Sequence, residues 1–201
     1  MKILGLWGSP RKGGNSEILL DAFLKGAQEG GAEVEKVALR ALKISPCLEI
    51  YHCFKDGTCP IKDDMQDLYP KLLAADVVAL ASPIFFYGLS AQAKAMIDRT
   101  QSQWARRYVL KDDFPGPDRQ GVLLCTGATT GKLLFVGARL TAKYFFDAIN
   151  VTYAAEILVR GVDEKGAILN KPEVLAAAAD LGRRLAQGEK PTPIKLSPLA
   201  V

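Results

Sequence analysis

Short apolar runs alternate with longer amphipathic segments along this chain, and the alternation limits the folds available to it. Five runs have the composition of strands, at residues 3–7, 32–39, 76–81, 121–125 and 151–159. Five longer segments have helical patterns, at residues 16–29, 63–73, 89–107, 132–149 and 172–187. Strands separated by helices pair in parallel through right-handed crossovers. The sequence therefore predicts an α/β fold with a five-stranded parallel sheet.

The length of the chain sets how many domains it can form. Its 201 residues fit one domain, given the usual ~100–200 residues per domain, and we expect that domain to span residues 1–187. Residues 44–62 have no periodicity and hold three cysteines, which indicates a cysteine-containing insertion loop. Residues 188–201 contain several prolines and are expected to form an extended C-terminal tail.

Composition and charge argue against several classes of protein. The chain is 49% hydrophobic and 24% charged, as globular proteins are. Its net charge of +4 is small, and the basic residues are scattered among acidic ones, so no nucleic-acid partner is expected. No run reaches the ~18–20 apolar residues of a membrane helix, and the N-terminal apolar run is shorter than the ~7–15 residues of a signal peptide. We therefore expect a cytoplasmic protein without a membrane partner.

A polar, glycine-rich loop follows the first predicted strand. It reads Gly-Ser-Pro-Arg-Lys-Gly-Gly-Asn-Ser over residues 8–16. Free N–H groups and the helix dipole at such a place favour an anion, and Ser9, Asn15, Ser16 and Arg11 add donors. The spacing fits neither a P-loop nor a Rossmann fingerprint. The alternative is an ordinary glycine-rich turn with a polar cap, but the length of the loop favours a phosphate.

Two further loops follow predicted strands, and in an open parallel sheet all three reach the edge where ligands bind. Residues 82–90 contain a proline, three adjacent aromatic residues and Gly88. This turn suits a planar ring, and Gly88 permits close approach of the backbone. The alternative is that the aromatic residues are core. Residues 126–132, Thr-Gly-Ala-Thr-Thr-Gly-Lys, form the third loop, for which a plain helix-entry turn is the alternative.

The sequence over residues 8–16, placed directly after a first strand, resembles the NADPH-dependent FMN reductase family of the flavodoxin-like superfamily. The resemblance implies a three-layer flavodoxin-like sandwich with strand order 2-1-3-4-5 and FMN bound at the three loops. It implies that the flavin phosphate is held by Ser9, Arg11, Asn15 and Ser16. It assigns the flavin ring to Pro83, Ile84, Phe85, Phe86, Tyr87 and Gly88, with Thr126, Gly127 and Thr129 at the other edge of the ring.

The same resemblance implies an oxidoreductase. NADPH or NADH would reduce the bound FMN, and the electrons would pass to a small acceptor such as a quinone or a flavin. No catalytic residue is expected, because the cofactor carries the chemistry. The alternative is an FMN-binding electron carrier that receives electrons from a partner protein, although the net charge of +4 favours the reductase. Dimers are common in the family, so we expect a homodimer or a higher homo-oligomer.

Three cysteines, Cys47, Cys53 and Cys59, lie within thirteen residues of one another. Clustered cysteines in a reducing compartment suggest metal binding or redox chemistry. Their spacing resembles the iron-sulfur flavoprotein subgroup, whose motif reads Pro-Cys-x-x-Cys-x-x-Cys with a further cysteine and an Asp-Asp-Met segment. Ile50 stands where that motif has its second cysteine.

A four-iron cluster uses four thiolates, so the missing cysteine leads us to expect no metal or cluster. Three alternatives stay open at this stage. His52 or Cys125 could supply a fourth cluster ligand, a zinc ion could bind the three cysteines and His52, or the thiols could be redox-active or simply accessible to solvent.

Overall fold

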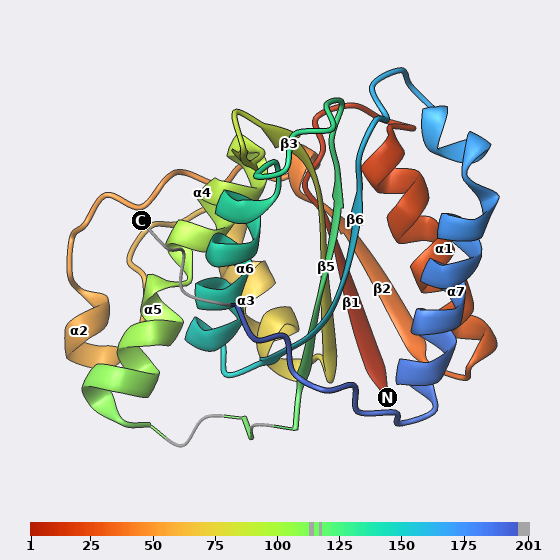
Figure 1. The fold of residues 1–201 in the computed structure, drawn as a ribbon. Coiled ribbons are helices and arrows are strands. Elements are labelled where there is room, and N and C mark those ends of the chain that lie inside the picture. Colours follow the sequence, from red (N-terminus) through yellow and green to blue (C-terminus); the bar gives the residue numbers. More distant parts are fainter. Residues whose placement is uncertain (113–114, 117, 197–201) are drawn as a thin grey trace.

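The computed structural model describes residues 1–112, 115–116 and 118–196, and its central feature is a sheet between two layers of helices (Figure 1). Five parallel strands run in the order β2-β1-β3-β5-β6. Their bounds are β1 Lys2–Trp7, β2 Glu33–Ala38, β3 Val77–Phe85, β5 Gln120–Thr126 and β6 Thr152–Val159. Counted among the parallel strands alone, this is the predicted order 2-1-3-4-5. The predicted α/β flavodoxin-like sandwich is confirmed.

Helices cover both faces of the sheet, as the nearly continuous apolar strands require. Helices α1 and α7 pack on one face, and α3, α4, α5 and α6 lie on the other (Figure 1). The longer helices are α1 Asn15–Glu29, α3 Met65–Ala74, α4 Ala91–Arg99, α6 Val136–Ala148 and α7 Pro172–Ala186. The short ones are η1 Leu39–Ala41, α2 Cys53–Asp56, α5 Gln101–Trp104, η2 Ala105–Leu110 and η3 Ala167–Asn170. One hydrophobic core therefore lies on each side of the sheet.

A sixth strand corrects the predicted count of five. Strand β3 continues past residue 81, and its end pairs antiparallel with the two-residue strand β4, Gly88–Leu89. The pairing joins Ile84 to Leu89 and Phe85 to Gly88. The apolar pattern used for prediction ends before this hairpin, because the hairpin is made by backbone pairing at the edge of the core. Sequence periodicity therefore did not reveal it.

The helix predicted over residues 89–107 is broken, which is a second correction. Helix α4 ends at Arg99, and α5 and the π-helical η2 continue after Thr100. The Thr100 hydroxyl donates to the carbonyl oxygen of Ile97 at 2.6 Å, and its backbone N–H donates to the same oxygen at 2.9 Å. Such local bonds compete with the regular helical ladder. The apolar pattern continues through the break, so periodicity predicted one long helix.

The tail after α7 runs back to the sheet. Its described part, residues 188–196, contains no helix or strand, and the Ile194 N–H donates to the Tyr153 carbonyl oxygen at 2.8 Å. Ile194 also packs against the core on the α6 side. The tail thus extends along β6, anchored by the packing of Ile194 and by hydrogen bonds that include those of Ile194 and of the Glu189 carbonyl oxygen with Gln120. In the described part of the chain, no helix is long and apolar enough to cross a membrane.

Candidate functional site

The first and second predicted loops meet at the carboxyl edge of the sheet. The Gly8 N–H donates to the Ala81 carbonyl oxygen at 2.8 Å, and the Ser90 hydroxyl donates to the Gly8 carbonyl oxygen at 2.5 Å. Ser90 also caps α4 by accepting from the Ala93 N–H at 3.2 Å. A Cβ on Gly8 would lie 3.0 Å from the Cβ of Ala93, so the close approach requires glycine. These contacts hold the two loops side by side.

The third loop joins the same edge through β5 and β6. Thr126 pairs with Pro83 in the parallel register. The Gly127 N–H donates to the Val159 carbonyl oxygen at 2.9 Å, and the Gly127 carbonyl oxygen accepts from the Val162 N–H at 3.1 Å. Thr126 and Gly127 are buried, whereas Thr129 is exposed at the rim. The structure thus brings all three predicted loops together.

Much of the backbone of the first loop is already bonded within the loop. The Ser9 hydroxyl accepts from the Arg11 N–H at 3.1 Å, and the Gly14 N–H donates to the Arg11 carbonyl oxygen at 3.3 Å. The Glu17 carboxylate accepts from the N–H of Gly13 at 2.5 Å. Gly13 needs its glycine, because its φ of 68° lies in the left-handed region. The loop is therefore shaped in advance, with part of its donors committed.

Asn15 holds two loops together. Its side-chain amide donates to the Glu164 carbonyl oxygen at 2.9 Å, and its side-chain oxygen accepts from the Ile168 N–H at 3.1 Å. Both partners lie in the segment after β6, about 150 residues away in the sequence. The side chain of Asn15 thus fixes the first loop against this segment, and its role in phosphate binding stays a prediction.

Ser16 differs from its neighbours because its polar atom is buried and unused. The residue is 1% exposed, and within the described residues its hydroxyl has no hydrogen-bond partner. Leaving a buried hydroxyl unpaired costs about 1–3 kcal/mol. The hydroxyl lies in the first turn of α1, at the positive end of the helix dipole. Such a donor fits an anionic group, and the predicted flavin phosphate is one.

Lys165 is a residue that the sequence analysis missed. A Cβ on Gly13 would lie 3.0 Å from Cε of Lys165 and 3.4 Å from its Nζ, so this side chain lies against the first loop. Arg11 reaches the same segment, with Nη1 donating to the Asp163 carbonyl oxygen at 3.3 Å. Lys165 follows the last strand, and every loop after a strand ends at this edge.

The aromatic turn is the tip of the β3–β4 hairpin. Phe86 and Tyr87 form its two-residue connection, with φ values of 49° and 63°. Two positive φ values mark the turn type that usually takes Asn-Gly. Phe85 and Tyr87 are half exposed and Phe86 is fully exposed, so the alternative of core aromatics is wrong. Gly88 has an ordinary φ and room for a Cβ on the protein side, so the close approach of its backbone to a ring stays a prediction.

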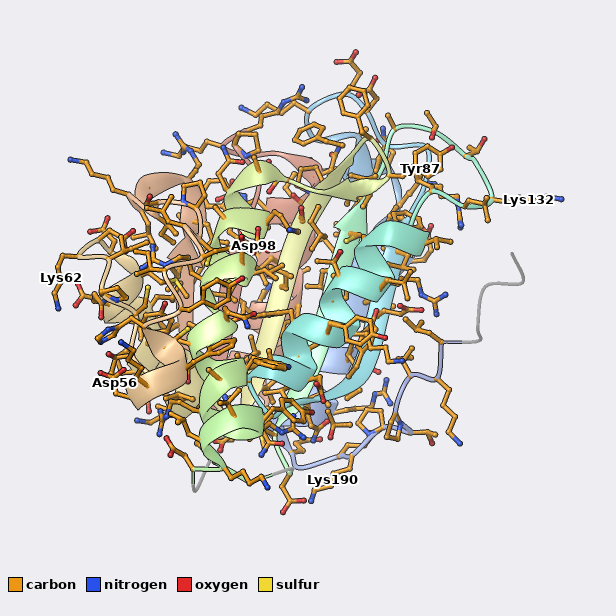
Figure 2. All side chains as sticks on the ribbon, turned by 90° about the vertical axis from the view of Figure 1, so that its left-hand side faces the viewer. Asp56, Lys62, Tyr87, Asp98, Lys132 and Lys190 are labelled. Atoms are coloured by element: carbon orange, nitrogen blue, oxygen red, sulfur yellow. The ribbon has the colours of Figure 1, made fainter. Side chains whose placement is uncertain are left out.

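The hairpin leans toward the third loop. A Cβ on Gly131 would lie 3.0 Å from the Tyr87 hydroxyl oxygen, and one on Gly137 would lie 2.7 Å from the Tyr87 carbonyl oxygen. Figure 2 shows Tyr87 and Lys132 at the same end of the molecule. Aromatic surface, buried and exposed donors and two cations thus border one edge of the sheet. This set suits a flat ring that carries a phosphate.

The cysteine loop forms a separate region beside α4 and α5 (Figure 1). In the portion of the chain that is described, no group of three His, Cys, Asp or Glu side chains could hold a metal ion. His52 is bonded to Asp56, with Nε2 and Oδ2 3.0 Å apart. Cys125 lies fully buried in β5, where burial raises its thiol pKa. Cys125 does not line the cavity beside the other cysteines, so it is not their fourth partner.

Known proteins resemble this chain in sequence and in fold. It is 39% identical over 101 residues to an iron-sulfur flavoprotein of Methanocaldococcus jannaschii, covering 50% of this chain and 52% of that protein. It is 40% identical over 116 residues to one of Archaeoglobus fulgidus, covering 58% and 52%. The chain spans about half the length of these relatives. A Bacillus subtilis protein named as an NAD(P)H-dependent FMN-containing oxidoreductase is 25% identical over 190 residues, covering 92% and 98%.

Among solved structures, an NAD(P)H:quinone oxidoreductase from Methanothermobacter marburgensis has the same fold. The TM-score is 0.71 at 20% identity, covering 92% of this chain and 96% of that one. The model of the NADPH-dependent FMN reductase family matches residues 1–137, which include all three loops. The family resemblance noted in the sequence is therefore confirmed, and FMN is the cofactor of that family. This chain belongs to the NADPH-dependent FMN reductase family.

Proposed function

We propose that this protein is an FMN-dependent NAD(P)H oxidoreductase that passes electrons from NADPH or NADH to a small acceptor such as a quinone or a flavin. The observation that carries the proposal is the buried Ser16 hydroxyl, which lacks an acceptor among the described residues. It lies at the helix end that the family resemblance assigns to the flavin phosphate. Family membership and the name of the Bacillus subtilis relative support the same class of reaction.

In this proposal, residues of the three loops bind different parts of the flavin. Ser16 donates to the flavin phosphate, and Arg11 and Lys165 supply positive charge beside it. The hairpin residues 83–88 present an apolar surface to the flavin ring, and Thr126, Gly127 and Thr129 border its other edge. Bound FMN supplies hydride acceptance and onward electron transfer. The protein positions the ring and leaves one side of it open to the nicotinamide and then to the acceptor.

One experiment separates this proposal from its main competitor. The protein is loaded with FMN under anaerobic conditions, and its visible spectrum is followed after addition of NADPH or NADH. Prompt bleaching of the flavin bands is the expected result. Flavin that resists both nucleotides but is reduced by dithionite would identify an electron carrier instead. That second candidate has its own support in the iron-sulfur flavoprotein relatives. A protein that takes up no FMN would contradict both.

Replacing Ser16 with alanine tests the phosphate site. Hydrogen bonds to charged groups contribute about 1.5–3 kcal/mol, so the Kd for FMN is expected to rise roughly 10- to 100-fold. The apoprotein should be no less stable, because the variant removes a buried donor without a partner. Titration of apoprotein with FMN and urea unfolding measure the two effects. The control Ser45→Ala, outside the three loops, should leave the Kd unchanged. If Ser16→Ala bound FMN as tightly as the parent, the flavin phosphate would not bind at the start of α1.

Because the β3–β4 hairpin is strained, relieving its strain is expected to raise the stability of the apoprotein and to weaken FMN binding. A Phe86→Asn, Tyr87→Gly variant puts residues that tolerate positive φ at both positions. Each strained residue costs about 1–3 kcal/mol, so the free energy of unfolding of the apoprotein should rise by about 1 kcal/mol or more. FMN binding should weaken, because both aromatic rings are lost from the flavin surface. A variant that is less stable, or that binds FMN as well as before, would contradict this assignment.

The exposed hairpin also supports the proposal of a homo-oligomer. Phe86 is fully exposed, and Phe85, Tyr87 and Leu133 are each about half exposed or more. Large apolar side chains gathered at one rim favour contact with another surface. Light scattering coupled to gel filtration is expected to give the mass of a dimer or a higher homo-oligomer. A monomer at all accessible concentrations would contradict the expectation.

A further inference from the structure

Arg160 comes directly after β6, at the edge of the sheet where the three loops meet. Val159 is the last residue of β6, and its carbonyl oxygen accepts from the Gly127 N–H at 2.9 Å. Gly161 follows Arg160 with a φ of 70°, and a Cβ on Gly161 would lie 3.9 Å from Cγ2 of Thr130. The turn after β6 therefore lies against the third loop.

The guanidinium of Arg160 is held on the third loop by three contacts. Its Nε donates to the Gly131 carbonyl oxygen, and its Nη2 donates to the Lys132 carbonyl oxygen, both at 3.3 Å. The guanidinium carbon lies 4.9 Å from the centroid of the Phe135 ring, within the range of a cation–π contact. Phe135 is 2% exposed, so its ring is a fixed part of the core. These contacts place a positive charge at a defined position on the loop.

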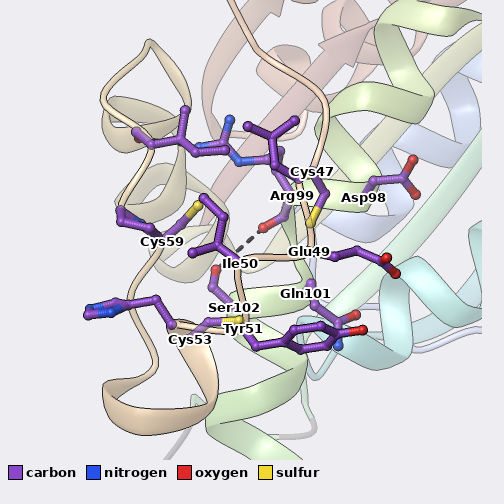
Figure 3. Close-up of a pocket in the computed structure, with 14 residues that line it drawn as sticks. Cys47, Glu49, Ile50, Tyr51, Cys53, Cys59, Asp98, Arg99, Gln101 and Ser102 are labelled. Carbon is purple, nitrogen blue, oxygen red and sulfur yellow. Dashed lines mark hydrogen bonds between the residues drawn. The ribbon is translucent and has the colours of Figure 1, made fainter.

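The charge of Arg160 has no acidic partner, which distinguishes it from other arginines of the chain. Arg99 lines a cavity of about 390 Å³ beside the cysteine loop (Figure 3), and Asp63 accepts from its Nη1 at 2.6 Å. Arg139 is paired with Glu156, with Nη2 and Oε1 2.8 Å apart. Among the described residues, Arg160 contacts two backbone carbonyls and an aromatic ring but no carboxylate. Its charge is therefore available to a ligand at this edge of the sheet.

A cation at this position would affect the two redox states of a flavin differently. The flavin ring gains negative charge when it is reduced, and charges near its N1 edge tune its electronic properties. In the proposed function, the third loop borders one edge of the ring. A cation fixed on that loop attracts the negatively charged reduced ring more strongly than the neutral oxidised ring. It would therefore make the bound flavin easier to reduce.

We propose that Arg160 is a positioning residue of the flavin site that favours the reduced cofactor, because it fixes the third loop and holds a positive charge beside the ring. The inference rests on the proposed function, since it requires the ring to lie at the third loop. Arg160 lies beyond the residues 1–137 that match the family model. Its assignment therefore comes from the contacts of this chain.

The test compares Arg160→Gln, which removes the charge, with Arg160→Lys, which keeps it. Each full-length variant is loaded with FMN, the Kd for oxidised FMN is measured by titration, and the reduction potential of the bound flavin is measured by anaerobic spectroelectrochemistry. In Arg160→Gln the affinity for reduced FMN relative to oxidised FMN should fall roughly fivefold to tenfold, as expected for one partly screened charge. A tenfold fall lowers the potential by about 30 mV. Arg160→Lys should retain most of the parent's potential.

Salt and a matched control separate the charge from other effects. The side chain of Arg160 is exposed, so the difference between the parent and Arg160→Gln should shrink near 1 M salt, where the Debye length is only about 3 Å. Arg183→Gln removes the same charge from α7. Arg183 pairs with Glu29 at 2.7 Å, at the end of α1 opposite the first loop. This control should leave the potential unchanged.

The possible outcomes distinguish this inference from the proposed function. FMN bound by Arg160→Gln with the parent's potential would overturn the role of Arg160 and leave the flavin site in place. An equal fall in Arg160→Lys, or a fall that high salt does not reduce, would assign the effect to hydrogen bonding and also overturn it. A parent that takes up no FMN would contradict both proposals. If Arg160→Gln fails to fold, the parent itself decides, because salt should lower its potential.

Discussion

Replacing Asp63 with alanine is expected to lower the free energy of unfolding by about 3–5 kcal/mol, because it leaves the Arg99 guanidinium buried without a counter-charge. The side chain of Arg99 is fully buried and that of Asp63 is 11% exposed, with Nη1 and Oδ2 2.6 Å apart. Asp63 also accepts from the Ser45 N–H at 2.8 Å, and Arg99 donates to the Ser45 carbonyl oxygen at 2.9 Å. The pair therefore joins the start of the cysteine loop to its end and to α4.

Urea unfolding of the single variant and of Asp63→Ala, Arg99→Met measures this effect. The double variant should recover much of the loss, since it removes the buried charge as well. If the double variant were as unstable as the single one, the uncompensated charge would not be the cause.

The same ion pair predicts a pH dependence. Burial raises the pKa of Asp63, but hydrogen bonding and the charge of Arg99 outweigh it and hold the pKa below its usual range. A carboxyl with a lowered folded-state pKa stabilises the protein above its unfolded pKa of about 3.9. That contribution is lost as the pH falls through the folded pKa. The stability difference between the parent and Asp63→Ala should therefore be constant near neutrality and shrink below about pH 4. A difference that persists in acid would contradict the assignment.

Replacing Gly26 with alanine is expected to destabilise the protein by about 2–3 kcal/mol, the upper part of the range for overpacking. A Cβ on Gly26 would lie 1.8 Å from the Ala179 carbonyl oxygen of α7. Gly182 makes the reciprocal contact, 2.1 Å from the Phe23 carbonyl oxygen of α1. In an exposed helix the same change would stabilise by about 1 kcal/mol. Here the backbone clash outweighs that preference, because the two helices must move apart.

Thermal and urea unfolding check the sign of the Gly26 effect. The matched control is Gly116→Ala, whose Cβ would meet no atom within 4 Å, and it should change stability little. A Gly26→Ala variant as stable as the parent would mean that α1 and α7 do not cross this closely. Combining Gly26→Ala with Gly182→Ala should cost less than the sum of the single variants, because one separation of the helices relieves both contacts.

The sequence predicted the fold well where local patterns decide it. The five parallel strands and the meeting of loops 8–16, 82–90 and 126–132 followed from apolar runs separated by amphipathic helices, and the order of the strands followed from the family resemblance. Element bounds were close for the strands of the core. Predictions failed where local bonding competes with periodicity, as at Thr100, which breaks the long helix, and at the β3–β4 hairpin. No apolar pattern distinguishes those places.

The candidate site, too, could be predicted from the sequence only in part. That residues 8–16 would present donors at a helix end could be predicted from the glycine-rich loop between a strand and a helix. Which of these donors are free could not be predicted from the sequence. Asn15 is engaged by a segment about 150 residues away, and Lys165 approaches Gly13 from that same segment. Such contacts depend on how distant parts of the chain pack, and one sequence contains no direct signal for them.

By itself the sequence determined the alternation of strands and helices, and with it the edge of the sheet at which a ligand is expected, because periodicity and turn chemistry act over a few residues. It also determined that a cysteine is missing at Ile50. Only the tertiary structure decided that Ser16 keeps an unpaired hydroxyl and that Arg99 faces the three cysteines with an unused Nε. The physical reason is that the satisfaction of a buried polar group depends on every element packed around it.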